Sequence, residues 1–381
     1  MRSVFGIATR VLVALGVASL LIILSACGGT ATSSASPSPG VVSVAAVFTM
    51  SNATAGNAVL RFQRAADGTL SPAGSFPTGG IGTGAGLENQ GGLALTDDQR
   101  FVLAVNAASN DLSVLRITDS GLQLVTRTAS GGTRPLSVAT RGTLVYVLNA
   151  GGESGQVDNI SGFRLGSGGQ LSPIAGSTQT LSAPATFPAQ IAITPNADFV
   201  VITERSTQVV RTFQLDGNGM PTGTVANTSA GLGPFGFTFG PGNVMLVSEA
   251  DTSSVSSYRI LSDGRLEAIS AALANNQRAA CWIALTPNGT LAYTANTGSS
   301  TISGYRLLAD GSLQLLDPTG RTVATTARPF DLAISPDGQF LYSLTGLSNI
   351  EVFRIDPATG SLVSVQNVSG LPSGSNGLVV Q

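Results

Sequence analysis

A short apolar segment followed by a turn recurs seven times along this chain. Its copies are Leu93-Ala94-Leu95-Thr96, Ser137-Val138-Ala139-Thr140, Ile191-Ala192-Ile193-Thr194, Phe237-Thr238-Phe239-Gly240, Ile283-Ala284-Leu285-Thr286, Leu332-Ala333-Ile334-Ser335 and Leu378-Val379-Val380-Gln381. Their fourth residues are spaced by 44, 54, 46, 46, 49 and 46 positions. One propeller blade occupies about 40 to 50 residues, so this spacing indicates one repeated structural unit.

The copy that begins at Ile283 shows what the unit is. Four β-rich runs are separated by turn residues, in the order Ile283–Thr286, Pro287-Asn288-Gly289, Leu291–Asn296, Ile302–Leu307, Asp310-Gly311 and Leu313 onward. Such runs and turns are typical of consecutive antiparallel hairpins. Seven copies therefore predict an all-β fold, a seven-bladed β-propeller with four-stranded antiparallel blades. The 47 glycines and the low charged fraction of 10% agree with many tight turns.

The two ends of the repeat predict how the ring closes. The first copy has a second strand near Val44–Met50 and a third near Val59–Gln63, but no inner strand of its own. The seventh inner strand, Gly377–Gln381, ends the chain. We expect it to pair into the first blade, because this leaves no open sheet edge at the seam. The propeller domain is then 41–381.

The N-terminus has the features of an export signal. Residues 1–27 contain Arg2 and Arg10, an apolar run shorter than a membrane span, and small residues before Cys27. This segment resembles a bacterial lipoprotein signal peptide, in which the cysteine is acylated. Residues 28–40 are rich in small and polar residues and are typical of a flexible tether. We expect a lipid-anchored protein of the bacterial cell envelope that faces the periplasm or the exterior.

Composition excludes several classes of function. There is no lysine, and the 17 arginines that remain after residue 27 face 21 acidic residues, so binding to nucleic acid is not expected. Without histidine or lysine the chain has no Ser-His-Asp triad, imidazole zinc site or Schiff base. We expect no cofactor, no metal site and a monomer. Cys281, the one cysteine after Cys27, is predicted to be a buried apolar residue.

Strand direction places the longer connections on one face of the ring. Loops between the second and third strands, and those that lead to the next blade, share this face, called the loop face below. A site is expected there, around the mouth of the central channel. Glu204 and Glu249 end the second strands of adjacent blades, so their carboxylates are candidates for a facing catalytic pair. Arginines of the same face are candidates to bind an anion, namely Arg134, Arg205, Arg278 and Arg328. The alternative is that these acids are solvated and that the arginines form ion pairs.

The repeat Ile283–Gly289 with Ala292–Asn296, and its partners at Leu332–Tyr342 and Val145–Asn149, resembles seven-bladed lactonase-like propellers. That group includes 6-phosphogluconolactonase and carboxymuconate lactonising enzyme, and is related to YVTN repeats. The resemblance implies a lactone substrate handled by acidic and arginine groups at the mouth, which Glu204, Glu249, Arg134, Arg278 and Arg328 would supply. The muconate enzymes are thought to use a histidine, which this chain lacks. Two hypotheses follow: an exported enzyme that acts on a small carboxylated or sugar lactone, or a non-catalytic propeller that binds a ligand, glycan or protein.

Overall fold

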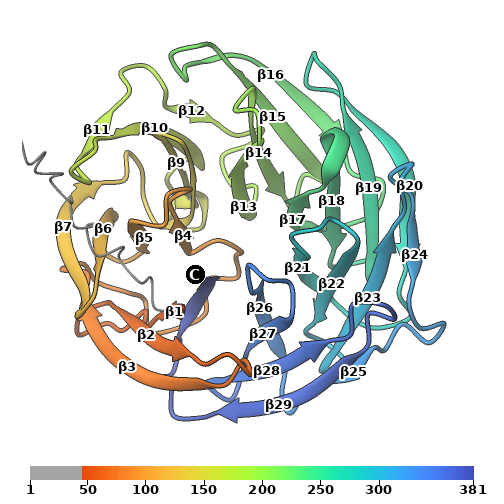
Figure 1. Cartoon of the computed structure of the whole chain (residues 1–381). Helices are drawn as coiled ribbons and strands as arrows, with labels where there is room; N and C mark the ends of the chain where they lie inside the picture. Colours follow the sequence, from red (N-terminus) through yellow and green to blue (C-terminus); the bar gives the residue numbers. More distant parts are fainter. Residues whose placement is uncertain (1–44) are drawn as a thin grey trace, which may run out of the picture. The chain divides into compact units, whose positions relative to one another are not determined.

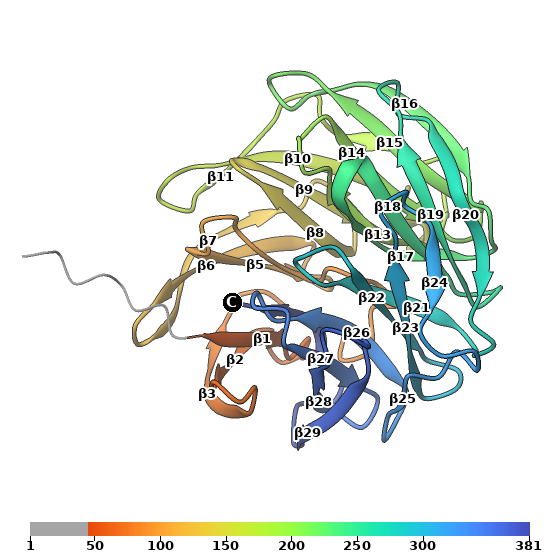
Figure 2. The ribbon, with the colours of Figure 1, turned by 45° about the vertical axis from the view of Figure 1, so that its right-hand side comes forward.

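The computed structural model describes residues 45–381, which form a ring of seven β-sheets (Figures 1 and 2). The predicted signal segment 1–27 with Cys27, and the tether 28–40, lie outside the described residues. Within the described range no helix has the length and hydropathy of a membrane span. The helical segments there are the single turns η1 (Gly151–Ser154) and η2 (Pro241–Asn243).

The first three blades follow the predicted order from the axis outward. Blade 1 consists of β30 (Asn376–Val380), β1 (Ala46–Met50), β2 (Ala58–Arg64) and β3 (Leu70–Pro77). Blade 2 consists of β4 (Leu93–Leu95), β5 (Phe101–Asn106), β6 (Asp111–Thr118) and β7 (Gly121–Ala129). Blade 3 consists of β8 (Pro135–Arg141), β9 (Leu144–Asn149), β10 (Asn159–Leu165), β11 (Leu171–Pro173) and β12 (Gln179–Thr180).

The remaining blades repeat the same topology. Blade 4 consists of β13 (Pro188–Ile193), β14 (Phe199–Glu204), β15 (Val209–Leu215) and β16 (Pro221–Thr228). Blade 5 consists of β17 (Pro234–Phe239), β18 (Val244–Glu249), β19 (Ser254–Ile260) and β20 (Leu266–Ala274). Blade 6 consists of β21 (Ala280–Leu285), β22 (Leu291–Asn296), β23 (Thr301–Leu307), β24 (Leu313–Leu315) and β25 (Val323–Ala324). Blade 7 consists of β26 (Pro329–Ile334), β27 (Phe340–Thr345), β28 (Asn349–Ile355) and β29 (Leu362–Val368).

These sheets confirm the seven-bladed prediction, with one refinement. In blades 3 and 6 the outer strand is broken into two short pieces, because both β11 and β12 pair with β10, and both β24 and β25 pair with β23. Each of these two blades therefore has five strands by pairing, although the chain still passes four times across the blade. The outer edge faces solvent, where an interrupted ladder costs little.

The predicted closure of the ring is confirmed. β30 pairs antiparallel with β1, with Val379 opposite Phe48 and Leu378 opposite Thr49. Figure 1 shows the C-terminal strand at the centre of the ring beside β1. The last strand of the chain is therefore the innermost strand of blade 1, and the ring has no unpaired edge at its seam.

The core lies between the blades. The second strand of each blade is buried at every position, because each sheet is covered by a neighbour on both faces. Tyrosines on three of these strands also link neighbouring blades through their hydroxyl groups: Tyr146 donates to the carbonyl of Gly219, Tyr293 to that of Gly360 and Tyr342 to that of Gly68. Each acceptor is a turn glycine of the following blade, so the repeat specifies the contact as well as the strands.

Candidate functional site

The connection between β3 and β4 reaches the centre of the ring (Figure 1). The amide of Gln90 donates to the carbonyl of Ala189 at 3.0 Å, and the indole nitrogen of Trp282 donates to the carbonyl of Asn89 at 2.7 Å. The amide of Val138 donates to the carbonyl of Gly91 at 2.8 Å. Residues 89–91 are therefore bonded to the inner strands of blades 3, 4 and 6 at once.

The side chain of Gln90 shows why this segment is fixed. Its amide nitrogen donates to the carbonyl of Ile283 at 2.8 Å, and its amide oxygen accepts from the Ile283 amide at 3.1 Å. The edge of the inner strand β21 that faces the axis has no neighbouring strand. The Gln90 carboxamide pairs with the backbone N–H and C=O groups of Ile283 at this edge, as a neighbouring strand would. Gly236 leaves room for the Gln90 side chain, because a Cβ at residue 236 would lie 2.2 Å from the Gln90 side-chain oxygen. The predicted mouth is thus not one open channel.

The larger pocket beside this segment has a volume of about 400 Å³. Trp282 and Phe330 form its aromatic wall, with ring centroids 6.1 Å apart. Glu88 and Arg328 are its two charged residues, and both are exposed. Small residues from four connections and the start of β30 complete the lining, namely Gly84, Ala85, Gly86, Thr297, Gly346, Ser348, Ser373, Gly374, Ser375 and Asn376. Its size and mixed lining suit a small, partly polar ligand.

A second pocket of about 80 Å³ shares Glu88 with the first. Arg134, Arg205 and Asp158 also line it. Burial lowers the pKa of the Arg134 guanidinium, while the charges of Asp158 and Glu88 oppose that effect. Asp158 is buried and accepts bonds from the amides of Gly152 and Thr186, so it also fixes the long loop of blade 3.

Three residues around the smaller pocket have a left-handed backbone. The φ angles are +54° at Glu88, +57° at Arg134 and +49° at Phe187, and none of these residues is glycine. Each lies just before an inner strand, in blades 2, 3 and 4 respectively. A left-handed conformation costs a non-glycine residue on the order of 1 kcal/mol, and such residues are concentrated at functional sites. Because Ala279, directly before β21 of blade 6, has the same conformation with φ +57°, it is here a feature of the repeat and does not by itself mark a site.

The predicted arginines separate into two groups. Arg134 and Arg205 line the smaller pocket and Arg328 lines the larger one. The guanidinium of Arg205 also lies 5.2 Å from the centre of the Phe235 ring. Arg278 lines neither pocket, and its guanidinium donates to the carbonyl of Gly298 at 3.0 Å. Glu88 was not among the candidate residues of the sequence analysis. It is the one acidic residue of the long glycine-rich connection 78–92, and this is the signal that could have selected it.

Glu204 is buried and bonded within its own region of the ring. One carboxylate oxygen accepts from Arg211 Nε at 2.8 Å, and the other accepts from Thr207 at 2.9 Å and from Ser182. Arg211 was missed by the sequence analysis. Glu204 pairs with Val209 in the ladder, so strand alternation puts Arg211, two positions on, on the same side of the sheet.

Glu249 is also buried, but in a different network. Its carboxylate accepts from the hydroxyls of Ser229, Ser254 and Ser256 and from the amide of Gly231. Hydrogen bonds thus occupy both acids separately, and none among the described residues joins one to the other. Asn106 and Asn296 occupy the same strand position and likewise bond to the connection from the preceding blade. These contacts favour an anchoring role, and a catalytic role for the two acids stays a prediction.

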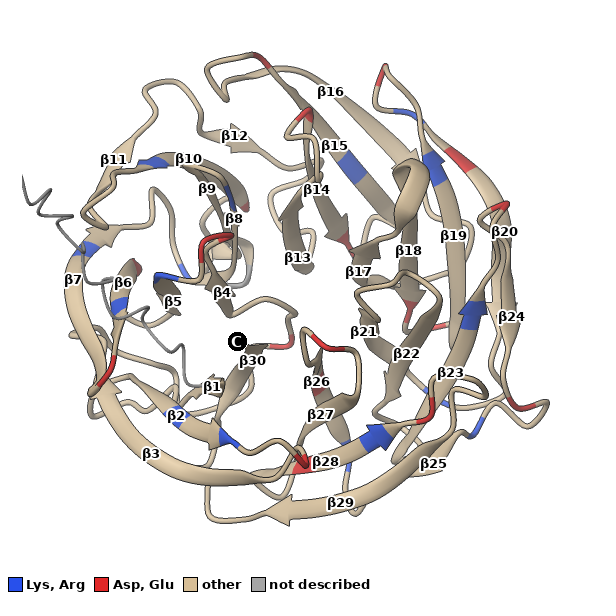
Figure 3. Cartoon of the chain, in the orientation of Figure 1, with Lys and Arg blue, Asp and Glu red and all other residues tan. Residues whose placement is uncertain are grey.

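Cys281 is buried, and burial raises the pKa of its thiol to about 12, so the thiol form is favoured. No group of three or more Cys, Asp or Glu side chains suited to a metal ion occurs among residues 45–381. Figure 3 shows acidic and basic positions scattered over the strands and turns of the ring.

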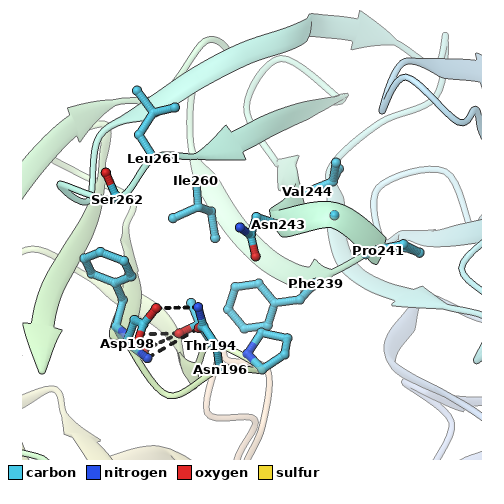
Figure 4. Close-up of a pocket in the computed structure, with 14 residues that line it drawn as sticks. Thr194, Asn196, Asp198, Phe239, Pro241, Asn243, Val244, Ile260, Leu261 and Ser262 are labelled. Atoms are coloured by element: carbon cyan, nitrogen blue, oxygen red, sulfur yellow. Dashed lines mark hydrogen bonds between the residues drawn. The ribbon is translucent and has the colours of Figure 1, made fainter. Parts of the chain in front are cut away.

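A third cavity, of about 330 Å³, lies on the opposite face between blades 4 and 5 (Figure 4). The turn from Phe239 to Val244 beside it has one residue fewer than the corresponding turn from Leu285 to Leu291. A similar cavity of about 320 Å³ lies between blades 2 and 3, where the turn from Ala139 to Leu144 is equally short. Both cavities therefore lie beside a shortened turn, and the charged residues that line them, Asp198 in one and Asp97, Asp98 and Arg100 in the other, belong to the turns of that face.

Comparison with known proteins agrees with this architecture. The family model described as lactonase, 7-bladed beta-propeller matches residues 55–180, 157–279 and 190–378. The chain belongs to this lactonase family. No curated protein matches it by sequence.

Solved structures share the fold of this lactonase-family chain at low sequence identity. A putative 6-phosphogluconolactonase from Bacteroides fragilis has a TM-score of 0.72 and 20% identity, over 90% of this chain and 100% of that one. Another, from Bacteroides uniformis, has a TM-score of 0.71 and 23% identity, over 87% and 99%. The periplasmic gluconolactonase of Pseudomonas aeruginosa has a TM-score of 0.68 and 19% identity, over 87% and 98%.

Proposed function

We propose that this protein opens a small sugar-type lactone in the larger pocket of the loop face. The observation that carries the proposal is the position of Glu88 and Arg328 at one cavity of about 400 Å³ with an aromatic wall, in a chain of the lactonase family. Aromatic faces pack against the C–H side of a sugar ring, while the small polar residues bind its hydroxyls. The fold neighbours with gluconolactonase names add support.

In the proposed reaction Glu88 acts as the general base. Its carboxylate takes a proton from water, and the water oxygen forms a bond to the lactone carbonyl carbon. The carbonyl oxygen becomes an oxyanion, whose charge the Arg328 guanidinium offsets. When the carbonyl re-forms, the bond to the ring oxygen breaks, and that oxygen takes the proton back from Glu88. The product is the open-chain hydroxy acid.

The charges of the larger pocket favour a neutral substrate over a phosphorylated one. Glu88 and Arg328 contribute opposite unit charges, so the pocket offers no excess positive charge to a phosphate dianion. The smaller pocket has two arginines but also two acids, and its volume is one fifth of the larger one's. We therefore expect gluconolactone to be opened with a higher kcat/KM than its 6-phosphate.

Steady-state hydrolysis of gluconolactone by the purified full chain tests the proposal. Glu88→Gln is expected to lower kcat by about 100-fold or more, in the range of general-base catalysis. Arg278→Ala is the matched control, since Arg278 lines neither pocket, and its kinetics should equal those of the original chain. Glu204→Gln and Glu249→Gln test the earlier assignment of the base. Full activity in Glu88→Gln, above the uncatalysed rate, would reject the mechanism.

A non-catalytic role is the second candidate, and exposed apolar side chains favour it. Five large apolar side chains that are at least 44% exposed lie on connections of the loop face, namely Ile81, Val157, Phe187, Leu232 and Leu347. Such residues around a pocket are typical of a surface that binds a protein partner. The absence of turnover over a panel of sugar, aliphatic and carboxylated lactones would select this reading.

We also propose export and lipid attachment at Cys27, on the basis of the charged, apolar and small-residue order of residues 1–27. Metabolic labelling with a radioactive fatty acid should mark the chain, and Cys27→Ser should abolish the label.

A further inference from the structure

The closing strand of the ring contributes directly to the larger pocket. Residues 373–376 line it, and Asn376, the first residue of β30, has 2% of its surface exposed, as has Ser375. Its backbone carbonyl accepts from the Thr49 hydroxyl at 3.3 Å, so the strand is held at this point. The position of Asn376 is thus determined by closure of the ring.

The carboxamide of Asn376 makes no hydrogen bond with any described residue. Its Oδ1 is buried without a partner, and Nδ2 donates to none of the described groups. The structure buries eight other asparagines between residues 45 and 381, and the carboxamide of each makes at least one hydrogen bond, for Asn349 once its amide is turned about. The Oδ1 atoms of Asn89 and Asn149 are also buried without a partner, but the amide nitrogen of each donates a hydrogen bond, whereas neither carboxamide atom of Asn376 is bonded to a described residue. Buried polar groups in folded proteins are nearly always paired, so a carboxamide that is wholly unpaired and lines a pocket indicates a ligand.

Gly92 gives this carboxamide its place. A Cβ at residue 92 would lie 2.6 Å from Asn376 Oδ1 and 2.8 Å from the Met50 methyl carbon, so any side chain there would displace one or both of these groups. The amide is therefore confined between a glycine backbone and the pocket. A side chain confined in this way does not need to reorganise when a substrate enters.

We propose that Asn376 is a catalytic residue, and that its Nδ2 donates a hydrogen bond to the carbonyl oxygen of the lactone as that oxygen becomes negative. The inference rests on the proposed function. Arg328 is exposed, so solvent screens its charge, whereas a donor in a buried, water-poor position interacts more strongly with a developing charge. Asn376 and Arg328 would bind the same oxyanion, one from the closing strand and one from the connection to blade 7.

Two substitutions at Asn376 separate a catalytic from a structural role. Asn376→Leu keeps the number and branching of the side-chain heavy atoms but removes the donor. We expect kcat for gluconolactone to fall by about 100-fold or more with KM changed by less than about 3-fold. Asn376→Asp keeps the shape but places a negative charge beside the oxyanion, so its kcat should be lower still. A structural role predicts that both variants unfold at a lower temperature in step with their loss of kcat, whereas a catalytic role predicts a loss of kcat without it. Arg278→Ala is the control, since Arg278 lines neither pocket, and its kinetics should equal those of the unmodified chain.

Each outcome is decisive. An inactive unmodified chain would overturn both this inference and the proposed function. Turnover by the unmodified chain, together with unchanged kcat in Asn376→Leu or a higher kcat in Asn376→Asp than in Asn376→Leu, would overturn the role of Asn376 alone. Thermal unfolding of the two variants, compared with that of the unmodified chain, shows that any loss of kcat occurs in a folded protein.

Discussion

Asp331 makes a testable link between pH and the stability of the ring. Asp331 lies on the inner strand of blade 7, and its side chain is buried. The side-chain oxygen Oδ1 accepts a hydrogen bond of 2.9 Å from the backbone amide of Leu332. Burial raises its pKa to about 8, and the hydrogen bonds from the amides of Leu332 and Leu378 only partly oppose that effect. Leu378 belongs to the closing strand, so this acid lies at the seam of the ring.

The sign of the pH effect follows from the raised pKa. Below pH 3.8 the carboxyl is protonated in both the folded and the unfolded chain, and burial costs nothing extra. Between pH 3.8 and about 8 the unfolded chain loses the proton and the folded chain keeps it. The free energy of unfolding therefore falls by up to about 1.4 kcal/mol per pH unit as pH rises, to a total of roughly 6 kcal/mol at most. Above about pH 8 this contribution is constant.

The substitution Asp331→Asn is expected to remove this dependence. The amide oxygen of the new side chain can accept the same two bonds without a charge, and asparagine tolerates the left-handed backbone at this position, where φ is +69°. Urea unfolding at pH 4, 6, 8 and 9 measures the difference in free energy between variant and unmodified chain. We expect a difference near zero at pH 4, growing in favour of the variant up to pH 8. A difference that does not vary with pH would refute the reasoning.

Two further predictions concern the buried acid of blade 4 and the closing strand. Arg211→Ala leaves the buried Glu204 carboxylate with hydroxyl partners alone, so the free energy of unfolding should fall by about 3–5 kcal/mol. Adding Glu204→Gln to that variant should restore part of the loss. Equal stability of the single and the double variant would contradict the pairing. Leu378→Ala removes a buried side chain at the seam and should lower the free energy of unfolding, measured by chemical denaturation, by about 2–5 kcal/mol. Val380→Ala, on the same strand but half-buried, should lower it by less. The opposite order would show that the seam is not packed as described.

The sequence by itself determined the number of blades, their strand order and the closure of the ring. Those features follow from local signals, namely alternating apolar residues and turn residues, and these signals recur in each of the seven copies of the repeat. The pairing of β30 with β1 followed because a ring without it would leave an open edge. The face that carries the longer connections followed from strand direction alone.

Tertiary structure decided which residues meet on that face. Glu204 and Glu249 occupy equivalent positions in neighbouring blades, but their side chains turn to separate partners, Arg211 for one and a group of serines for the other. The connection through Gln90 crosses to blade 6, a contact between residues 193 positions apart, which no local pattern encodes. It divides the mouth and gives Glu88 its place between two pockets. Strand periodicity governs neighbours within a blade, whereas contacts across the axis depend on side-chain packing that is settled only when all seven blades are assembled.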